Sequence, residues 1–134
     1  MSVLEGAISR GVAKFSYDFA QQGGVVGDIV MAGNPLPKGA VIWDGVVDMI
    51  TAVVGAGATV ALTSSQTGND LITAAAVAGA PWSSTGLKAL VPVGTAAAGI
   101  KLTADRAPKL VITAAALTAG KFNLFIEFYR SDST

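Results

Sequence analysis

The sequence predicts an all-β protein: one antiparallel β-sandwich domain of jelly-roll type, with about eight strands. Three observations support this prediction. Apolar and polar residues alternate with a period of two in segments 13–19 and 122–128. Short runs rich in Val, Ile and Thr recur along the chain, separated by Gly, Pro, Asn and Asp. No segment shows the period of about 3.6 residues that marks an amphipathic helix.

The elements follow from these patterns in chain order. Residues 1–12 lack a clear period and are expected to form an arm or a short edge segment, which leaves residues 13–134 for the sandwich domain. A turn is expected at 21–24, and irregular backbone at 33–39, because the two prolines there lack backbone donors. The segments expected to form strands are 13–19, 25–31, 40–54, 59–63, 71–77, 87–93, 100–103, 110–117 and 122–128.

The longest of these segments, 40–54, has the clearest assignment of side chains to faces. Gly45 in its middle predicts a β-bulge or a close approach of another backbone. Asp44 and Asp48 share a parity and are expected on a solvated outer face, about 13 Å apart by the strand rise, which is too far for an acid/base pair. The residues of the other parity, expected to face the core, are Val41, Trp43, Val47, Met49 and Val53.

An internal similarity predicts two related hairpins. Residues 58–78 and 98–118 share eight identical positions at an offset of 40. Duplication and convergence on an Ala- and Thr-rich composition both explain this similarity. The Ala-rich segments 73–80 and 113–119 are expected to be strand ends and not helices, because they are short and follow β-branched residues.

The first and last strands carry most of the aromatic residues, so they are expected to lie close together and close the core. The residues expected to pack there are Phe15, Tyr17, Phe19, Phe122, Phe125 and Phe128.

The low charge predicts association with other subunits. Charged residues make up 13% of the chain, against about 25% in an ordinary soluble domain. We therefore expect part of the surface to be buried in a homo-oligomer. A membrane does not explain the composition, because the apolar runs are interrupted well short of the ~20 residues of a spanning helix. The zero net charge and the scattered Lys and Arg residues argue against nucleic acid as a partner.

The chain has no histidine and no cysteine. A Ser/His/Asp triad is therefore excluded, the commonest transition-metal ligands are missing, and there is no disulfide framework. Only a Ser/Lys pair such as Ser84 with Lys88 stays formally open. The first residues lack the continuous apolar stretch of a secretory signal. We expect a protein that is not an enzyme and binds no cofactor or metal.

Three further features have simple structural explanations. The glycines of segment 55–58 lack the rest of a nucleotide-binding fingerprint, which favours a plain turn. Asn69 and Asp70 offer only two oxygen ligands to calcium, and turn formation explains them as well. Trp82 suits either a sugar-stacking platform or a loop anchor that closes the end of the sandwich.

Several motifs together resemble a known family. They are APWSSTG at 80–86, LTADR at 102–106 and LTAGKF at 117–122, within a similarity that runs over about residues 13–129. This pattern resembles the capsid decoration, or cement, proteins of tailed bacteriophages. The resemblance implies a jelly-roll-like subunit, usually trimeric or dimeric, which binds where major capsid subunits meet and has no catalytic residues. A trimer suits the local symmetry of an icosahedral lattice better than a dimer.

We therefore expect a structural virion protein, made in the host cytoplasm, that binds the outer capsid surface and stabilises it by bridging major capsid subunits. The alternative is a carbohydrate-binding β-sandwich that a virion can display, with Trp82 or Trp43 as its platform. Asp105 and Arg106 form a turn and a candidate ion pair between subunits. The residues expected to contact the capsid or other copies are Val3, Leu4, Ile8, Trp82, Asp105 and Arg106.

Overall fold

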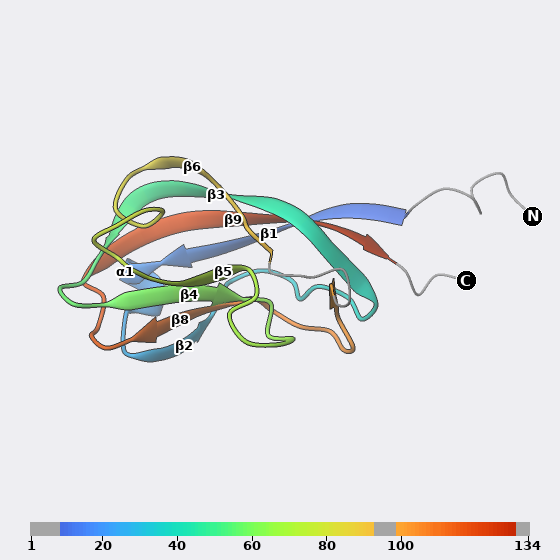
Figure 1. Ribbon diagram of the computed structural model, residues 1–134, viewed down its shortest axis with the longest axis horizontal. Coiled ribbons are helices and arrows are strands. Elements are labelled where there is room, and N and C mark those ends of the chain that lie inside the picture. Colours follow the sequence, from blue (N-terminus) through green and yellow to red (C-terminus); the bar gives the residue numbers. More distant parts are fainter. Residues whose placement is uncertain (1–8, 93–98, 131–134) are drawn as a thin grey trace, which may run out of the picture.

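The computed structural model describes residues 9–92 and 99–130, and nearly all of its regular structure is β-strand. Two antiparallel sheets form the molecule (Figure 1). Sheet A has the strand order β1-β9-β3-β6, with β7 also paired to β3, and sheet B has the order β2-β8-β4-β5. The strands in this part of the chain are β1 (Ser9–Asp18), β2 (Gly27–Val30), β3 (Ala40–Val54), β4 (Thr59–Thr63), β5 (Ile72–Ala76), β6 (Gly86–Ala89), β7 (Ile100–Lys101), β8 (Lys109–Thr113) and β9 (Ala119–Arg130).

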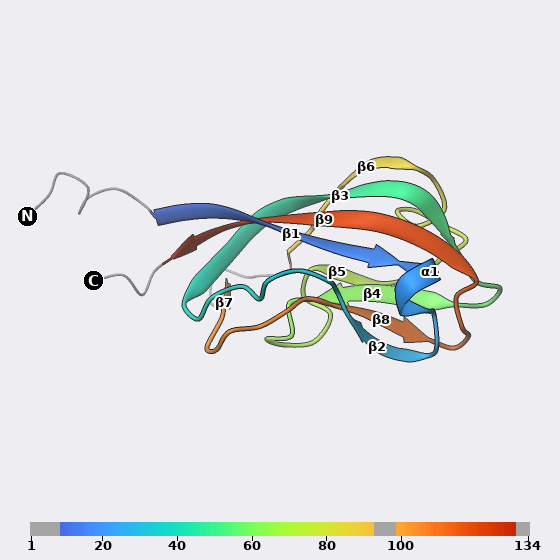
Figure 2. The ribbon, with the colours of Figure 1, turned by 180° about the vertical axis from the view of Figure 1, so that it is seen from behind.

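This strand order confirms the predicted jelly-roll sandwich. The chain alternates between the sheets from β1 to β4, and the later strands return to fill the places between the earlier ones. As a result β9 lies between β1 and β3, and β8 lies between β2 and β4. Figure 2 shows β1 and β9, from opposite ends of the sequence, side by side along the molecule.

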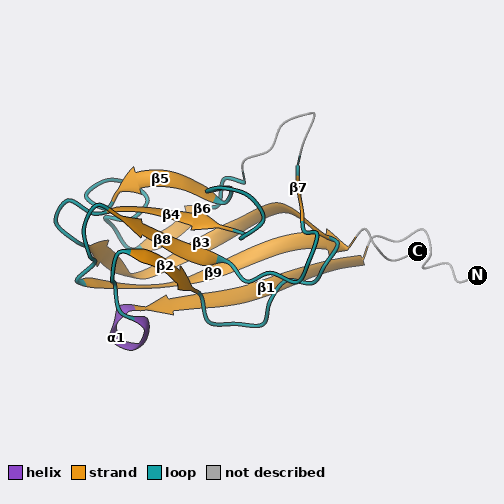
Figure 3. Cartoon of the chain, turned by 90° about the horizontal axis from the view of Figure 1, so that it is seen from below, coloured by secondary structure: helices purple, strands orange, loops and turns teal. Residues whose placement is uncertain are grey.

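Within residues 9–92 and 99–130, helix is confined to one short turn, α1 (Phe19–Gln22), which follows β1 directly (Figure 3). Strand β1 ends at Asp18 because this residue caps the helix: its side chain accepts a hydrogen bond from the backbone N–H of Ala20 at 3.0 Å. The segments 73–80 and 113–119 contain no helix, as predicted. No helix of the described residues is long and apolar enough to cross a membrane.

Strand β1 forms one edge of sheet A. Residues 9–12 belong to this strand and pair with β9. Residues 1–8, the rest of the expected arm or edge segment, lie outside the described residues.

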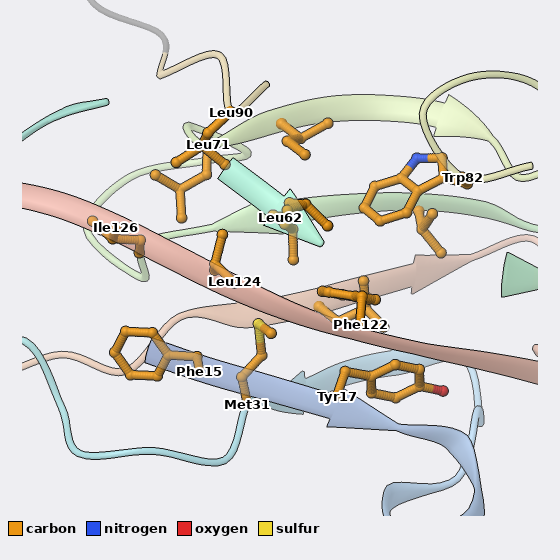
Figure 4. Close-up of a cluster of buried hydrophobic side chains, with 14 of the residues drawn as sticks. Phe15, Tyr17, Met31, Leu62, Leu71, Trp82, Leu90, Phe122, Leu124 and Ile126 are labelled. Atoms are coloured by element: carbon orange, nitrogen blue, oxygen red, sulfur yellow. The ribbon is translucent and has the colours of Figure 1, made fainter. Parts of the chain in front are cut away.

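The core lies between the two sheets and joins the two ends of the chain (Figure 4). Phe15, Tyr17 and Phe122 are fully buried, and the rings of Tyr17 and Phe122 lie 5.5 Å apart. Phe19 and Phe128 pack against this core while partly exposed. The prediction for Phe125 was wrong, because its neighbours at 124 and 126 face inward and turn it to the opposite face.

Burial also raises the pKa of Tyr17 to about 12, with a further contribution from the charge of Asp18. The neutral hydroxyl donates a hydrogen bond to the backbone oxygen of Gly23 at 2.6 Å. This bond ties β1 to the turn after α1.

Gly45 sits at the predicted irregularity in β3. The register of β3 against β9 shifts between Ile42 and Asp44, and a Cβ atom at Gly45 would lie 2.3 Å from the backbone oxygen of Phe125. The bulge reverses the side-chain alternation at this point, so Ile42 is buried and Trp43 is exposed. The predicted inward positions of Val41 and Trp43 were therefore wrong, whereas Val47, Met49 and Val53 do face the core.

The prediction of two similar hairpins was half right. Strands β4 and β5 pair as a hairpin, with Val60 opposite Ala75. The corresponding strands β7 and β8 do not pair with each other: β7 joins β3 in sheet A, and β8 lies between β2 and β4 in sheet B. The jelly-roll path separates them, so similar local sequence ends in different pairing.

Candidate interaction surface

The outer face of sheet A leaves several apolar side chains uncovered. Five of its apolar residues, Val12, Trp43, Val46, Ile50 and Leu87, are between 39% and 72% exposed. They come from three strands, and Phe125 of β9 lies half-buried among them. We define the outer face of sheet A as Arg10, Val12, Lys14, Ser16, Trp43, Asp44, Val46, Asp48, Ile50, Leu87, Ala89, Asn123, Phe125, Glu127 and Tyr129.

The charges in the middle of this face differ in sign from strand to strand, whereas at one end Asp18 of β1 lies opposite Lys121 of β9. Arg10 and Lys14 lie on β1, and Asp44 and Asp48 lie on β3, with β9 between the two strands. Arg10 is 3.7 Å from Glu127 of β9, in the one ion pair among the described residues. Lys14 of β1 therefore has no ion-pair partner in that part of the chain.

A shallow hollow of about 300 Å³ lies in the middle of the face. Gly45 and Phe125 are among the residues that line it. Val12 and Val46 form apolar walls, and carboxylates at 44 and 127 form the rim. The hollow has the size for a side chain of a partner.

An aromatic cluster lies beside the hollow. The rings of Trp43 and Tyr129 are stacked with centroids 5.7 Å apart, and the guanidinium carbon of Arg10 lies 5.5 Å from Trp43 and 5.9 Å from Tyr129. This arrangement orients Trp43 by cation–π and stacking contacts. Trp43 keeps part of its surface free, so it remains available to a ligand or partner.

Trp82 is a loop anchor. Its side chain is fully buried, its ring lies 5.9 Å from that of Phe122, and its backbone oxygen accepts a hydrogen bond from Val53 N–H at 2.9 Å (Figure 4). A sugar ring could not stack on it, so the platform hypothesis was wrong for this residue. For the same reason Trp82 presents no surface to another subunit.

Asp105 and Arg106 brace neighbouring loops of their own chain. The Asp105 side chain accepts a hydrogen bond from Lys38 N–H at 2.7 Å. Arg106 donates to the side chain of Gln66 at 2.7 Å, to the backbone oxygen of Ser65 at 3.2 Å and to a hydroxyl oxygen at residue 103 at 3.1 Å. The guanidinium of Arg106 thus already donates its hydrogen bonds to acceptors within the chain. Val3, Leu4 and Ile8 lie outside the described residues.

Asp70 is buried in the same region. The hydrogen bonds of its carboxylate hold the turn, so the turn needs no bound cation. Its two carboxylate oxygens accept hydrogen bonds from the backbone N–H of Ser64 at 2.6 Å and from the Ser64 hydroxyl at 2.5 Å. No group of three or more potential metal ligands of the His, Cys, Asp and Glu types occurs in the described residues. We call Ser64, Ser65, Gln66, Asp70, Thr103 and Arg106 the loop cluster. Sequence spacing gave no indication of it, since its two halves are about forty residues apart.

The remaining sequence candidates have no chemical site around them. Lys88 does donate to the Ser84 hydroxyl at 2.7 Å, but the pair is exposed and solvated, whereas a lysine base needs a desolvated setting. Residues 55–58 form the expected turn, in which Ala58 N–H donates to the oxygen of Gly55 at 3.0 Å. This turn borders an apolar crevice of about 450 Å³ at the end of the sandwich.

Comparisons with known proteins place the fold among virus structures. No family model and no curated protein matches the sequence. One similar solved structure is a chain of "Cyanophage Pam1 capsid asymmetric unit", with 16% identity, a TM-score of 0.59 and coverage of 91% of this chain and 85% of that chain. Another is a chain of "Acidic stable capsid structure of Helicobacter pylori bacteriophage KHP30", with 12% identity, a TM-score of 0.58 and coverage of 90% and 87%. At this identity the likeness shows a shared fold.

Proposed function

We propose that this chain is a structural protein of a bacteriophage virion. It binds the outer surface of the assembled capsid as a homo-oligomer and stabilises the shell by bridging major capsid subunits. The observation that carries the proposal is the fold, which matches chains from two phage capsid structures over nine-tenths of this sequence. The motifs that resemble phage decoration proteins point to the same role.

The surface chemistry supports a binding role. The outer face of sheet A exposes apolar side chains from three strands. A protein of this kind acts by mass action: it binds the assembled shell more tightly than separated subunits and so stabilises the shell. Several small contacts from one oligomer add up to tight attachment.

The N-terminal segment is the proposed capsid contact. Val3, Leu4 and Ile8 supply apolar side chains there, outside the regular alternation of a core strand. A terminal segment that becomes ordered on docking is a common form of attachment. Because residues 9–12 pair with β9, a deletion that keeps the fold must stop at residue 8.

The test uses empty shells assembled from the major capsid protein of the same phage. Shells with the full-length protein should disassemble at a higher temperature than bare shells, as measured by light scattering and calorimetry. A chain without residues 1–8 should keep its circular dichroism spectrum and lose most of this protection. Equal protection by both chains would refute the arm contact, and no protection by either would refute the proposed function.

Carbohydrate binding at Trp43 is the second candidate function. The exposed, stacked pair of Trp43 and Tyr129 beside Arg10 has the aromatic surface and hydrogen-bond donor that sugar sites use. Titration calorimetry with a panel of oligosaccharides tests this function directly. Binding that is lost in Trp43→Ala would support it, and no heat from any oligosaccharide would exclude it.

A further inference from the structure

We propose that the outer face of sheet A is the interface between copies of this chain. In this interface the basic strip of one copy, Arg10 and Lys14, lies against the acidic strip of the next, Asp44 and Asp48. The inference deepens the proposed function, because it names the surface that forms the homo-oligomer. It rests on the distribution of side chains over one sheet face.

The apolar side chains of the face provide the surface area that a second copy would bury. Val12 and Leu87 are 63% and 72% exposed, and they lie on opposite sides of the more buried Phe125 and Val46. The helix α1 lies at the end of β1 (Figure 3). An exposed apolar surface that spans several strands usually marks an interaction site.

The charged part of the face is complementary to itself. Lys14 lies in one row with Phe125 and Val46, and Asp44 and Asp48 lie two residues to either side of Val46. Two strand spacings of about 4.8 Å separate the backbones of β1 and β3 by about 10 Å. Among the described residues Lys14 forms no ion pair with either aspartate, whereas Arg10 is already paired with Glu127 of its own copy. Lys101 and Lys121 lie toward the two ends of the face and outside this pattern.

A second copy fits this face with simple symmetry. A half-turn about an axis parallel to β9 lays β1 of each copy over β3 of the other and brings Lys14 between Asp44 and Asp48. A three-fold axis in the same direction places the β1 side of each copy beside the β3 side of the next. Both closures make the same contact between unlike charges. A foreign partner would instead need its own matching pair of strips.

Charge reversal tests this contact by sedimentation velocity, at a concentration where the wild-type chain is assembled. Lys14→Glu and Asp48→Lys should each raise the dissociation constant about 10- to 100-fold, because each places like charges together at every contact. The double variant K14E/D48K should return close to wild type. An equimolar mixture of the two single variants should also assemble more tightly than either one alone, since each supplies the charge that the other lacks.

The matched control is Asp28→Lys on β2 of sheet B, an exposed charge reversal away from this face, which should not change assembly. Circular dichroism confirms that each variant is folded. A monomeric wild type, single variants that assemble normally, or a double variant that stays dissociated would each overturn the interface. Shell binding is measured separately: a chain that attaches to shells as a monomer refutes this interface alone. A chain that assembles but never binds shells refutes the capsid role alone.

Discussion

The loop cluster and the outer face of sheet A use polar residues in opposite ways. In the loop cluster, the charged groups of Asp70 and Arg106 are each satisfied by several hydrogen bonds within the chain. On the outer face of sheet A, Lys14 has no ion-pair partner among the described residues, and Val12 is mostly exposed. Polar groups that are hydrogen-bonded within the chain stabilise the fold. Uncovered apolar surface and unpaired charges contribute favourable free energy only when a partner binds them. Substitutions in the loop cluster should therefore lower folding stability without changing association, and substitutions on the outer face of sheet A should weaken association with little change in stability.

The largest expected loss of folding stability comes from Asp70→Ala. This substitution removes both acceptors of Ser64 and leaves a buried N–H and a buried hydroxyl without partners, so the free energy of unfolding should fall by about 2–4 kcal/mol. Urea unfolding measures the change, and assembly of the folded fraction should stay normal. Asp28→Ala, at an exposed position, is the control and should change stability by less than about 0.5 kcal/mol.

Arg106→Lys should cost about 1–2 kcal/mol, less than the Asp70 change, because the position is only half-buried. An ammonium group cannot reproduce the fork that reaches Gln66, Ser65 and Thr103 together. Thermal unfolding measures the loss. If Lys proves as good as Arg at this position, the loop cluster does not act as a network.

A smaller effect, present only at alkaline pH, involves the core. The folded chain holds the pKa of Tyr17 at about 12, whereas a tyrosine in the unfolded chain titrates near 10. Below pH 10 both states keep the proton, and above it the unfolded chain loses the proton first, so stability should fall progressively as pH rises from 10 to 12. Urea midpoints measured across this range test the prediction. Tyr17→Phe should show a shallower fall, and an equal fall would assign the effect to other groups.

The smallest expected change in stability belongs to the outer face of sheet A. The double substitution Val12→Ser and Leu87→Ser removes exposed apolar surface, so the free energy of unfolding should change by about 0.5 kcal/mol or less. Assembly should nevertheless weaken about tenfold or more, because the proposed interface buries this surface between subunits. A matched pair of substitutions away from this face, Val26→Ser just before β2 and Val30→Ser in β2, should leave assembly unchanged.

Local sequence was sufficient to predict the strands of the fold. It was not sufficient to predict which side chains of each strand face the core. The bounds of β3 and β4 match the prediction because turn residues and β-branched runs mark them. The bulge near Gly45 was also visible in the sequence, yet its consequence, the outward position of Trp43, depends on how many residues the bulge absorbs. The two-residue alternation of segment 122–128 correctly predicts that Phe122 is buried. Applied strictly, the same alternation places Phe125 on the outer face.

The candidate site was harder to predict because it depends on strand neighbours distant in the sequence. Arg10, Lys14 and Asp48 share one face only because β9 inserts between β1 and β3, and no local pattern specifies that insertion. The same holds for Arg106, whose partners lie about forty residues away. The low charge of the chain predicts that some surface needs a partner, but it does not say which surface.

The most direct test of the account is cosedimentation of the purified chain with empty shells and, separately, with dissociated major capsid subunits. The account predicts saturable binding to shells, at a fixed ratio to the capsid subunits, and much weaker binding to the dissociated subunits. Modest salt should reduce binding little, since a chain with 13% charged residues makes mainly apolar and hydrogen-bonded contacts. Protein that remains in the supernatant with shells at every concentration would contradict a capsid-stabilising role.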